Sequence, residues 1–181
     1  MLQLTEEDRK LIHILRGVDV FQDVADNLLD QRNGAILITC SDGDQFCDVF
    51  HHQEKLQTGQ RPHPRIHTFA WHGGILACAP RSPINKRGYA HLILLDQIGD
   101  ARAMKDINVV IARAHAPCGA ARNKGISLKK VIALQFRAQQ RIKALNEGIV
   151  VACFFDVDYG DRKRTYFISR HEWENWTHKN P

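Results

Sequence analysis

The sequence has no apolar run long enough to cross a membrane and no segment typical of a secretory signal. No apolar stretch in the 181 residues approaches the roughly 20 residues that a transmembrane helix requires. The first ten residues, MLQLTEEDRK, carry acidic side chains where a secretory signal would be positively charged, and no apolar segment with a cleavage site follows. These absences predict a cytoplasmic protein with no membrane partner.

The sequence also lacks the cysteine pattern of a disulfide framework. Its five cysteines are an odd number and lie far apart, at positions 40, 47, 78, 118 and 153. A chain of this length can bury a core without covalent links, so the pattern favours reduced thiols or metal ligands. The 44% hydrophobic and 25% charged content is ordinary for a globular protein, which argues against intrinsic disorder. We expect one domain over residues 1–181.

Positive charge is only slightly in excess. A formal net charge of +5 permits contact with nucleic acid or an anionic substrate without requiring it. The basic residues are scattered, and their densest run, 162–164, is of a kind usual in solvated turns. No patch combines aromatic and basic side chains, so we expect no nucleic-acid partner.

Helical and strand patterns alternate along the chain. Short apolar segments predict four strands, over residues 35–39, 65–71, 107–112 and 148–157. The periodicity of apolar residues predicts helices over residues 5–16, 18–31, 47–58, 89–104 and 126–145. Residues 72–86, with two glycines and two prolines, predict a long loop; residues 164–169 predict an antiparallel edge strand, and the tail predicts a short helix. The fold class is therefore α/β, with a mainly parallel central sheet flanked by helices.

Three candidate metal ligands stand at the ends of predicted strands. Cys40 follows the first strand, and His115 and Cys118 follow the third. Ligands of open α/β sheets bind beyond the carboxyl ends of the strands, so these side chains converge if the two strands are neighbours. Two thiolates and one imidazole suit zinc, and three protein ligands leave a fourth position for water or substrate. Spacing alone is weak evidence, because an isolated H-x-x-C is common by chance.

The residues around these ligands resemble motifs of the β-carbonic anhydrases. Residues 38–42, I-T-C-S-D, resemble the family's C-S-D segment, and residues 114–120, A-H-A-P-C-G-A, resemble its G-H-x-x-C-G segment. Residues 155–160, F-D-V-D-Y-G, are similar to the Y-D-V-x-T-G turn that follows the last core strand of the family. The resemblance covers residues 34–170.

The resemblance implies a β-carbonic anhydrase-like fold, with N-terminal helices in 1–33 and a zinc-binding core in 34–170. It implies that Cys40, His115 and Cys118 bind zinc, and that Asp42 is a catalytic residue that either coordinates the metal or accepts a hydrogen bond beside it. The implied reaction is attack of a zinc-bound hydroxide on carbon dioxide or a related small electrophile, with bicarbonate as product, in a homodimer or larger homo-oligomer. The alternative is a non-catalytic zinc-binding protein with a structural or regulatory role. Neither reading identifies substrate-binding residues.

Two segments depart from the family pattern. The family's C-S-D-S-R becomes C-S-D-G-D, so that Asp44 replaces an arginine, and R-N-A-G-N is replaced by W-H-G-G-I over residues 71–75. Both departures weaken the case for ordinary carbon dioxide hydration. Arg113 or Arg122, which bracket the H-x-x-C motif, could supply the missing positive charge, or each could be an ordinary surface arginine.

The remaining cysteines and histidines have structural explanations beside functional ones. Cys153 lies within an apolar strand and is expected to pack there; Cys78 is also expected to lie outside the metal site, and a structural role is favoured for Cys47. His67 and His72 could face the pocket and shuttle protons, or could be surface residues. Three further histidines could form a second metal cluster, or they could be solvated: His51, His52 and His63.

Overall fold

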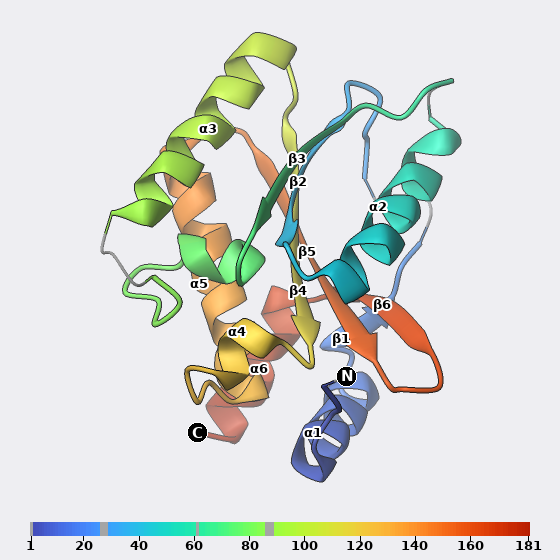
Figure 1. The fold of residues 1–181 in the computed structure, drawn as a ribbon, viewed down its shortest axis with the longest axis vertical. Helices are drawn as coiled ribbons and strands as arrows, with labels where there is room; N and C mark the ends of the chain where they lie inside the picture. Colours follow the sequence, from blue (N-terminus) through green and yellow to red (C-terminus); the bar gives the residue numbers. More distant parts are fainter. Residues whose placement is uncertain (1, 26–28, 61, 86–88) are drawn as a thin grey trace.

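A six-stranded sheet with the strand order β1-β6-β5-β4-β2-β3 forms the centre of the computed structural model, which describes residues 2–25, 29–60, 62–85 and 89–181 (Figure 1). The strands are β1 (Phe21–Asp23), β2 (Ala35–Cys40), β3 (Ile66–Trp71), β4 (Val109–Ala116), β5 (Val150–Asp158) and β6 (Lys163–Ile168). The helices are α1 (Glu6–Gly17), α2 (Gly43–Thr58), the 3-10 helix η1 (Gly74–Cys78), α3 (Ala90–Lys105), α4 (Gly119–Arg122), α5 (Leu128–Leu145) and α6 (Arg170–Lys179).

The four strands β3, β2, β4 and β5 are parallel, and β6 pairs with β5 in the antiparallel direction. The predicted α/β class, with a mainly parallel sheet and an antiparallel strand near the C-terminus, is therefore confirmed. All six residues of β2 are buried, because helices cover both faces of the parallel part of the sheet. This explains why β2 is a continuous apolar run in the sequence rather than an alternating one.

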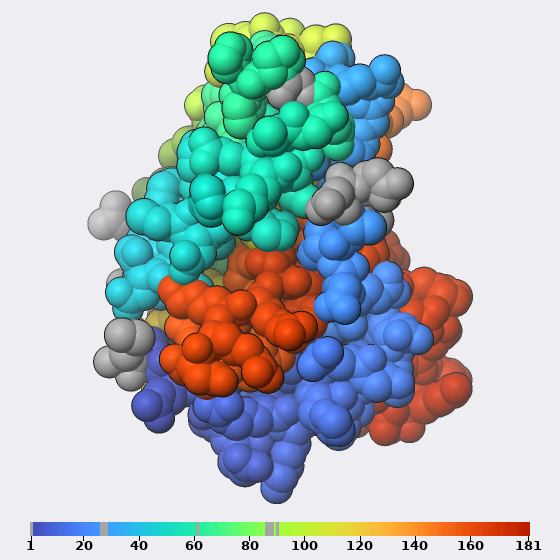
Figure 2. Space-filling view, turned by 90° about the vertical axis from the view of Figure 1, so that its right-hand side faces the viewer, coloured from blue at the N-terminus to red at the C-terminus, as the bar shows by residue number. Residues whose placement is uncertain are grey.

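Two apolar cores lie on opposite faces of the sheet. Val49 and Leu56 of α2 pack on one face against Leu37 and Ile111 of the central strands. Residues of η1, α3 and α5 pack on the other face in a larger cluster. Figure 2 shows the α2 side of the molecule, with the segment that joins β5 to β6 directly below the helix. The face under α2 is thus covered by one helix and one hairpin, with a hollow of about 450 Å³ between them.

The helix predicted over residues 18–31 is wrong in the described part of that range. Helix α1 ends at Gly17, and Phe21 begins β1, which pairs antiparallel with β6. The ring of Phe21 packs on Phe155 and Tyr166, with centroid distances of 5.2 and 5.4 Å. This tertiary packing overrides the helix-like spacing of the apolar residues. Residues 26–28 of the predicted helix lie outside the described part.

Three other boundaries differ from the sequence-based expectation. The long loop predicted over residues 72–86 contains the fully buried η1, and its last residue is not described. Strand β4 continues to Ala116 and so includes His115, and α2 begins at Gly43, directly after Asp42. Within the described ranges, no helix is both long and apolar enough to span a membrane.

Candidate metal centre

Neighbouring parallel strands bring three predicted ligands together. Strand β2 pairs with β4, and Cys40 ends β2 while His115 lies near the end of β4. The chain then passes a cis Ala116–Pro117 bond and places Cys118 at the start of α4. One donor atom from each of Cys40, His115 and Cys118 lies within 4.8 Å of the others, and all three residues are buried. The convergence expected from the strand ends is present.

The two thiols influence each other's ionisation strongly. Their mutual hydrogen bond lowers the pKa of Cys40 well below its ordinary value and raises the pKa of Cys118, so that the pair holds one negative charge. Burial by itself would lower the pKa of His115, but the neighbouring Cys40 thiolate and the negative charges of Asp42 and Asp156 raise it. The site therefore combines an anionic thiolate, a protonated thiol and an imidazole whose positive form is favoured, and a divalent cation could replace the proton of the thiol.

The donor set and its unsatisfied atoms fit zinc. Two sulfur atoms and one imidazole nitrogen form a combination that binds zinc with tetrahedral geometry. Both ring nitrogens of His115 are buried and have no hydrogen-bond partner, although buried polar atoms normally have one. A metal ion bound at the site would give one of these two nitrogens a partner.

The turn after β3 contributes a backbone group that the sequence reading missed. The N–H of Gly73 donates to Sγ of Cys40 at 3.3 Å and helps to lower the pKa of that thiol. Gly74 has φ of +53°, and a Cβ atom there would lie 2.7 Å from the backbone nitrogen of Cys40 and from the carbonyl carbon of Thr39. The only available signal was the Gly-Gly pair, which occurs where a strand next to β2 ends.

Asp42 lies beside the three candidate ligands without joining their cluster. Its Oδ1 accepts a hydrogen bond from the backbone N–H of Asp44 at 3.0 Å, so it caps the N-terminus of α2. Its Oδ2 lies 4.0 Å from Nε2 of His115. Asp42 therefore has one oxygen engaged in the helix cap and the other near Nε2 of His115.

Neither arginine that brackets the H-x-x-C motif pairs with Asp42. Arg113 is buried and forms an ion pair with Asp156 at 3.0 Å. Arg122 donates to the backbone carbonyl of Gln3 at 2.7 Å and so attaches the N-terminal segment to α4. Among the described residues, no arginine or lysine forms an ion pair with Asp42.

A hollow of about 290 Å³ borders the site on the side of α1. His115, Pro117 and Cys118 contribute to its wall, and Asp8 of α1 and Arg122 also line it. Two of the three candidate ligands therefore border this hollow.

Comparisons with known proteins identify a fold likeness only. No protein-family model and no curated protein matches the sequence. A carbonic anhydrase from Streptococcus mutans is similar in structure, with 10% identity, a TM-score of 0.45, and coverage of 91% of this chain and 99% of that chain. The β-carbonic anhydrase CafA of the fungal pathogen Aspergillus fumigatus has 14% identity, a TM-score of 0.41, and coverage of 96% and 89%. Similarity at this level says nothing about the chemistry of this chain, which must be judged from its own residues.

The other histidines singled out in the sequence lie outside the ligand cluster. His67 is half-buried on β3, where its ring lies 4.8 Å from that of Phe69, and His72 is exposed. His51 and His63 are exposed, whereas the ring of His52 contacts Arg113. Within the described ranges, the grouping of Cys40, His115 and Cys118 is the only set of three or more residues suited to a metal, so the three remaining histidines do not form a second one.

The other cysteines also lie outside the ligand cluster. Cys78 and Cys153 are fully buried in the apolar core, and Cys47 is exposed on α2. All five cysteines are free thiols in the structure.

Proposed function

We propose that this protein binds one zinc ion through Cys40, His115 and Cys118 and acts, weakly, as a β-carbonic anhydrase-type lyase on carbon dioxide or bicarbonate. The observation that supports this most directly is the convergence of three buried donor atoms within 4.8 Å at the ends of two parallel strands. The motif resemblance around these residues supports the choice of substrate class. A homodimer or larger homo-oligomer and a cytoplasmic location remain predictions.

Each group at the proposed site has a separate role in the reaction. Zinc, when bound, supplies a water nucleophile at neutral pH. The Gly73 N–H holds the Cys40 thiolate in place at the end of β2. Asp42 has a free carboxylate oxygen near Nε2 of His115, where it can accept a proton from the nucleophile and orient it. The hollow beside Cys118 provides space for a small electrophile.

The surroundings of Asp42 favour weak activity. An arginine paired with this carboxylate would hold it away from the metal, but the residue two positions later is Asp44, and no described cation takes over the role. Two unit charges about 4 Å apart interact by roughly 4 kcal/mol at an effective dielectric of 20, which is the upper end of what an arginine at position 44 could contribute. Asp44 provides no such attraction, so less holds Asp42 away from a dication. We propose that Asp42 would be a fourth ligand in the resting protein near neutral pH, and that a water nucleophile would be available only when Asp42 turns away from the metal.

The same observation supports the second candidate function. If Asp42 remains on the metal under all conditions, the centre has no open position, and the protein is a non-catalytic zinc protein with a structural or regulatory role. A structural zinc site is closed in this sense, whereas a catalytic site keeps an open position.

Metal analysis combined with stopped-flow carbon dioxide hydration tests the proposal. We expect about one zinc per chain in the wild-type protein and marked zinc loss in Cys40→Ser, His115→Ala and Cys118→Ser. Cys47→Ser is the matched control, because this exposed thiol lies outside the ligand cluster and should leave zinc content unchanged. Full zinc retention in any ligand variant removes that residue from the ligand set, and zinc-loaded protein without hydration activity favours the non-catalytic alternative.

A further inference from the structure

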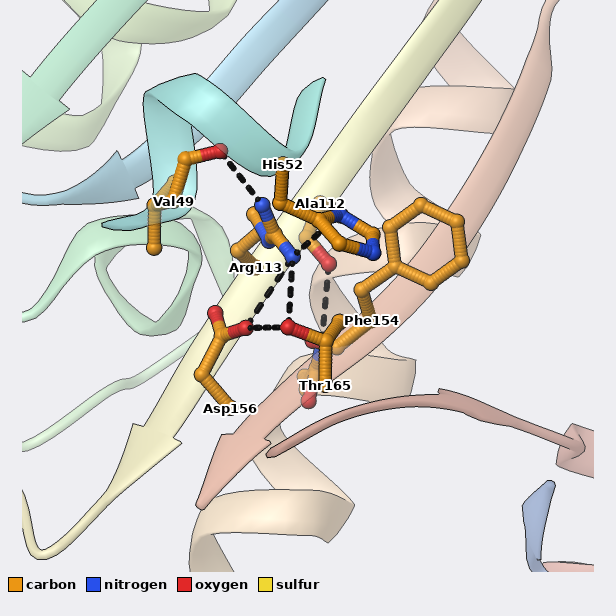
Figure 3. Close-up of polar contacts among 8 residues, drawn as sticks. Val49, His52, Ala112, Arg113, Phe154, Asp156 and Thr165 are labelled. Atoms are coloured by element: carbon orange, nitrogen blue, oxygen red, sulfur yellow. Dashed lines mark hydrogen bonds and ion pairs between the residues drawn. The ribbon is translucent and has the colours of Figure 1, made fainter. Parts of the chain in front are cut away.

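A buried ion pair lies on the α2 face of the sheet, two residues before His115 on the same strand (Figure 3). The guanidinium of Arg113, which is 1% exposed, donates to Oδ1 of Asp156 at 3.0 Å, to Oγ1 of Thr165 at 3.2 Å and to the Val49 carbonyl at 2.8 Å. Its Nη2 also lies 3.2 Å from Nδ1 of His52. Thr165 in turn donates to the same Oδ1 of Asp156 at 2.6 Å. One carboxylate oxygen is thus held by two donors.

Asp156 is the register partner of His115 in the parallel pair of β4 and β5. Side chains at positions i and i+2 of a strand lie on the same face, so His115 shares the α2 face with Arg113. Asp156 contacts Arg113 and therefore lies on that face as well. The carboxylate and the imidazole are consequently side-chain neighbours on adjacent strands.

Asp156, His115 and Arg113 each have buried polar atoms without hydrogen-bond partners. Oδ2 of Asp156, Nδ1 and Nε2 of His115, and Nε of Arg113 are all buried and form no hydrogen bond. Nε2 of His115 lies 4.0 Å from Oδ2 of Asp42, which follows Cys40 by two residues, so we infer that Nε2 is the nitrogen that meets the metal. Metal binding there leaves Nδ1–H as a buried donor in need of an acceptor, and Oδ2 of Asp156 is a buried acceptor in need of a donor.

We propose that Asp156 is a positioning residue for the metal centre. Its Oδ2 accepts the Nδ1–H of His115, directly or through one buried water molecule, and so holds the imidazole in the tautomer whose Nε2 lone pair is free for the metal. This inference rests on the proposed zinc site and names a residue that the motif resemblance placed only in a turn. The resulting order is Arg113, Asp156, His115 and metal, running across β4 and β5.

The arrangement also explains why an ion pair is buried here. Removing a charged pair from water is expensive, and apolar residues of similar size would often be as stable or more stable. An anionic acceptor on the imidazole, however, raises its basicity and fixes its orientation toward a metal. Arg113 and Thr165 hold Oδ1 and thereby orient Oδ2, while α2 covers the pair from above.

Asp156→Asn is the decisive variant, with Thr165→Val as its matched control. The Asn carbonyl can replace Oδ1 as acceptor for Arg113, which turns the amide NH₂ toward Nδ1 and favours the Nε2–H tautomer that cannot bind metal through Nε2. We expect a zinc affinity about 10–100-fold lower than that of the wild type, measured by chelator competition. Thr165→Val removes one donor to Oδ1 but keeps Oδ2, and we expect a much smaller loss.

Histidine tautomers measured by long-range ¹H–¹⁵N NMR provide a readout that a purely structural role would not change. We expect Nδ1 of His115 to be protonated in the zinc-loaded wild type, and Nε2–H to increase in metal-free Asp156→Asn. If that variant does not fold, a structure of the zinc-loaded wild type decides: Nδ1 bonded to Asp156, directly or through one water, supports the inference, and Nδ1 bonded to a main-chain carbonyl or to zinc refutes it. Wild type that binds no zinc refutes the proposed function and this inference together, whereas zinc-binding wild type with an unaffected Asp156→Asn refutes the inference alone.

Discussion

The close approach of Gly74 to the end of β2 predicts that a single methyl group there will damage the metal centre. In Gly74→Ala, the new Cβ would lie 2.7 Å from the backbone nitrogen of Cys40. Real Cβ atoms do not approach backbone this closely, and neither the nitrogen nor the adjacent Thr39 carbonyl can move without displacing the strand end. We therefore expect the variant to fold with Cys40 shifted from the other ligands.

The magnitude follows from two contributions. An alanine at positive φ costs about 1–2 kcal/mol, because its Cβ crowds the following carbonyl oxygen. Overpacking against a rigid neighbour adds about 1–3 kcal/mol. The sum of about 2–5 kcal/mol corresponds to a decrease in Tm of about 4–20 °C for a chain of this size.

Gly125→Ala separates the two contributions. Gly125 has φ of +61°, close to the +53° of Gly74, but a Cβ atom there meets nothing within 4 Å. The Gly125→Ala variant should lose only about 1–2 kcal/mol of unfolding free energy, from the positive φ alone, and should retain its zinc. The assay is thermal unfolding with excess chelator, together with zinc content before chelation. Equal Tm values and equal zinc contents for the two variants would refute the reasoning.

Three further predictions concern protons, thiols and charge. Because the pKa of Cys118 is raised, this thiol holds its proton at neutral pH, so zinc binding should release about one proton from it and the apparent affinity should rise with pH. Calorimetry in buffers of different ionisation enthalpy measures the number of protons released, and zero would contradict the assignment. Burial raises the pKa of Cys78 to about 12, which leaves a thiolate fraction of about 10⁻⁴ at pH 8. Iodoacetamide should therefore modify the exposed Cys47 first and Cys78 only in denaturant. Peptide mass spectrometry can establish this order. Asp44→Arg should increase carbon dioxide hydration in stopped-flow assays by drawing Asp42 off the metal, and brisk wild-type activity that this change fails to increase would show that position 44 does not control the site.

The sequence predicted those parts of the fold that depend on local pattern. The apolar run of β2, the β-branched run of β4 and the periodicity of α5 each correspond to an element in the structure. The convergence of the three candidate ligands was predictable because a motif and a strand end coincide at each of them. The strand β1 was not identifiable, because Phe21 fits a helical spacing as well as a strand, and the rings that decide between them lie more than 130 residues later in the chain.

Two contacts that depend on the path of the chain and on strand register could not be predicted from the sequence. The Gly73 N–H that contacts Cys40 has no side chain to mark it, and its position depends on the path of the chain after β3. The pairing of Arg113 with Asp156 depends on the register of β4 and β5, which no local pattern specifies. From the sequence, Arg113 could be a source of positive charge near Asp42 or an ordinary surface arginine, whereas its place on β4 buries it beside Asp156.

The three-residue strand β1 protects the outer edge of β6, and this affects how self-association should be measured. A chain shortened to begin after Asp23 would leave the outward-facing N–H and C=O groups of β6 unpaired and would uncover the rings of Phe155 and Tyr166. An exposed edge of this kind pairs readily with a strand from another molecule. Dimers formed by such a shortened chain would reflect the missing strand, so the predicted homo-oligomer can be tested only with protein that retains residues 21–23.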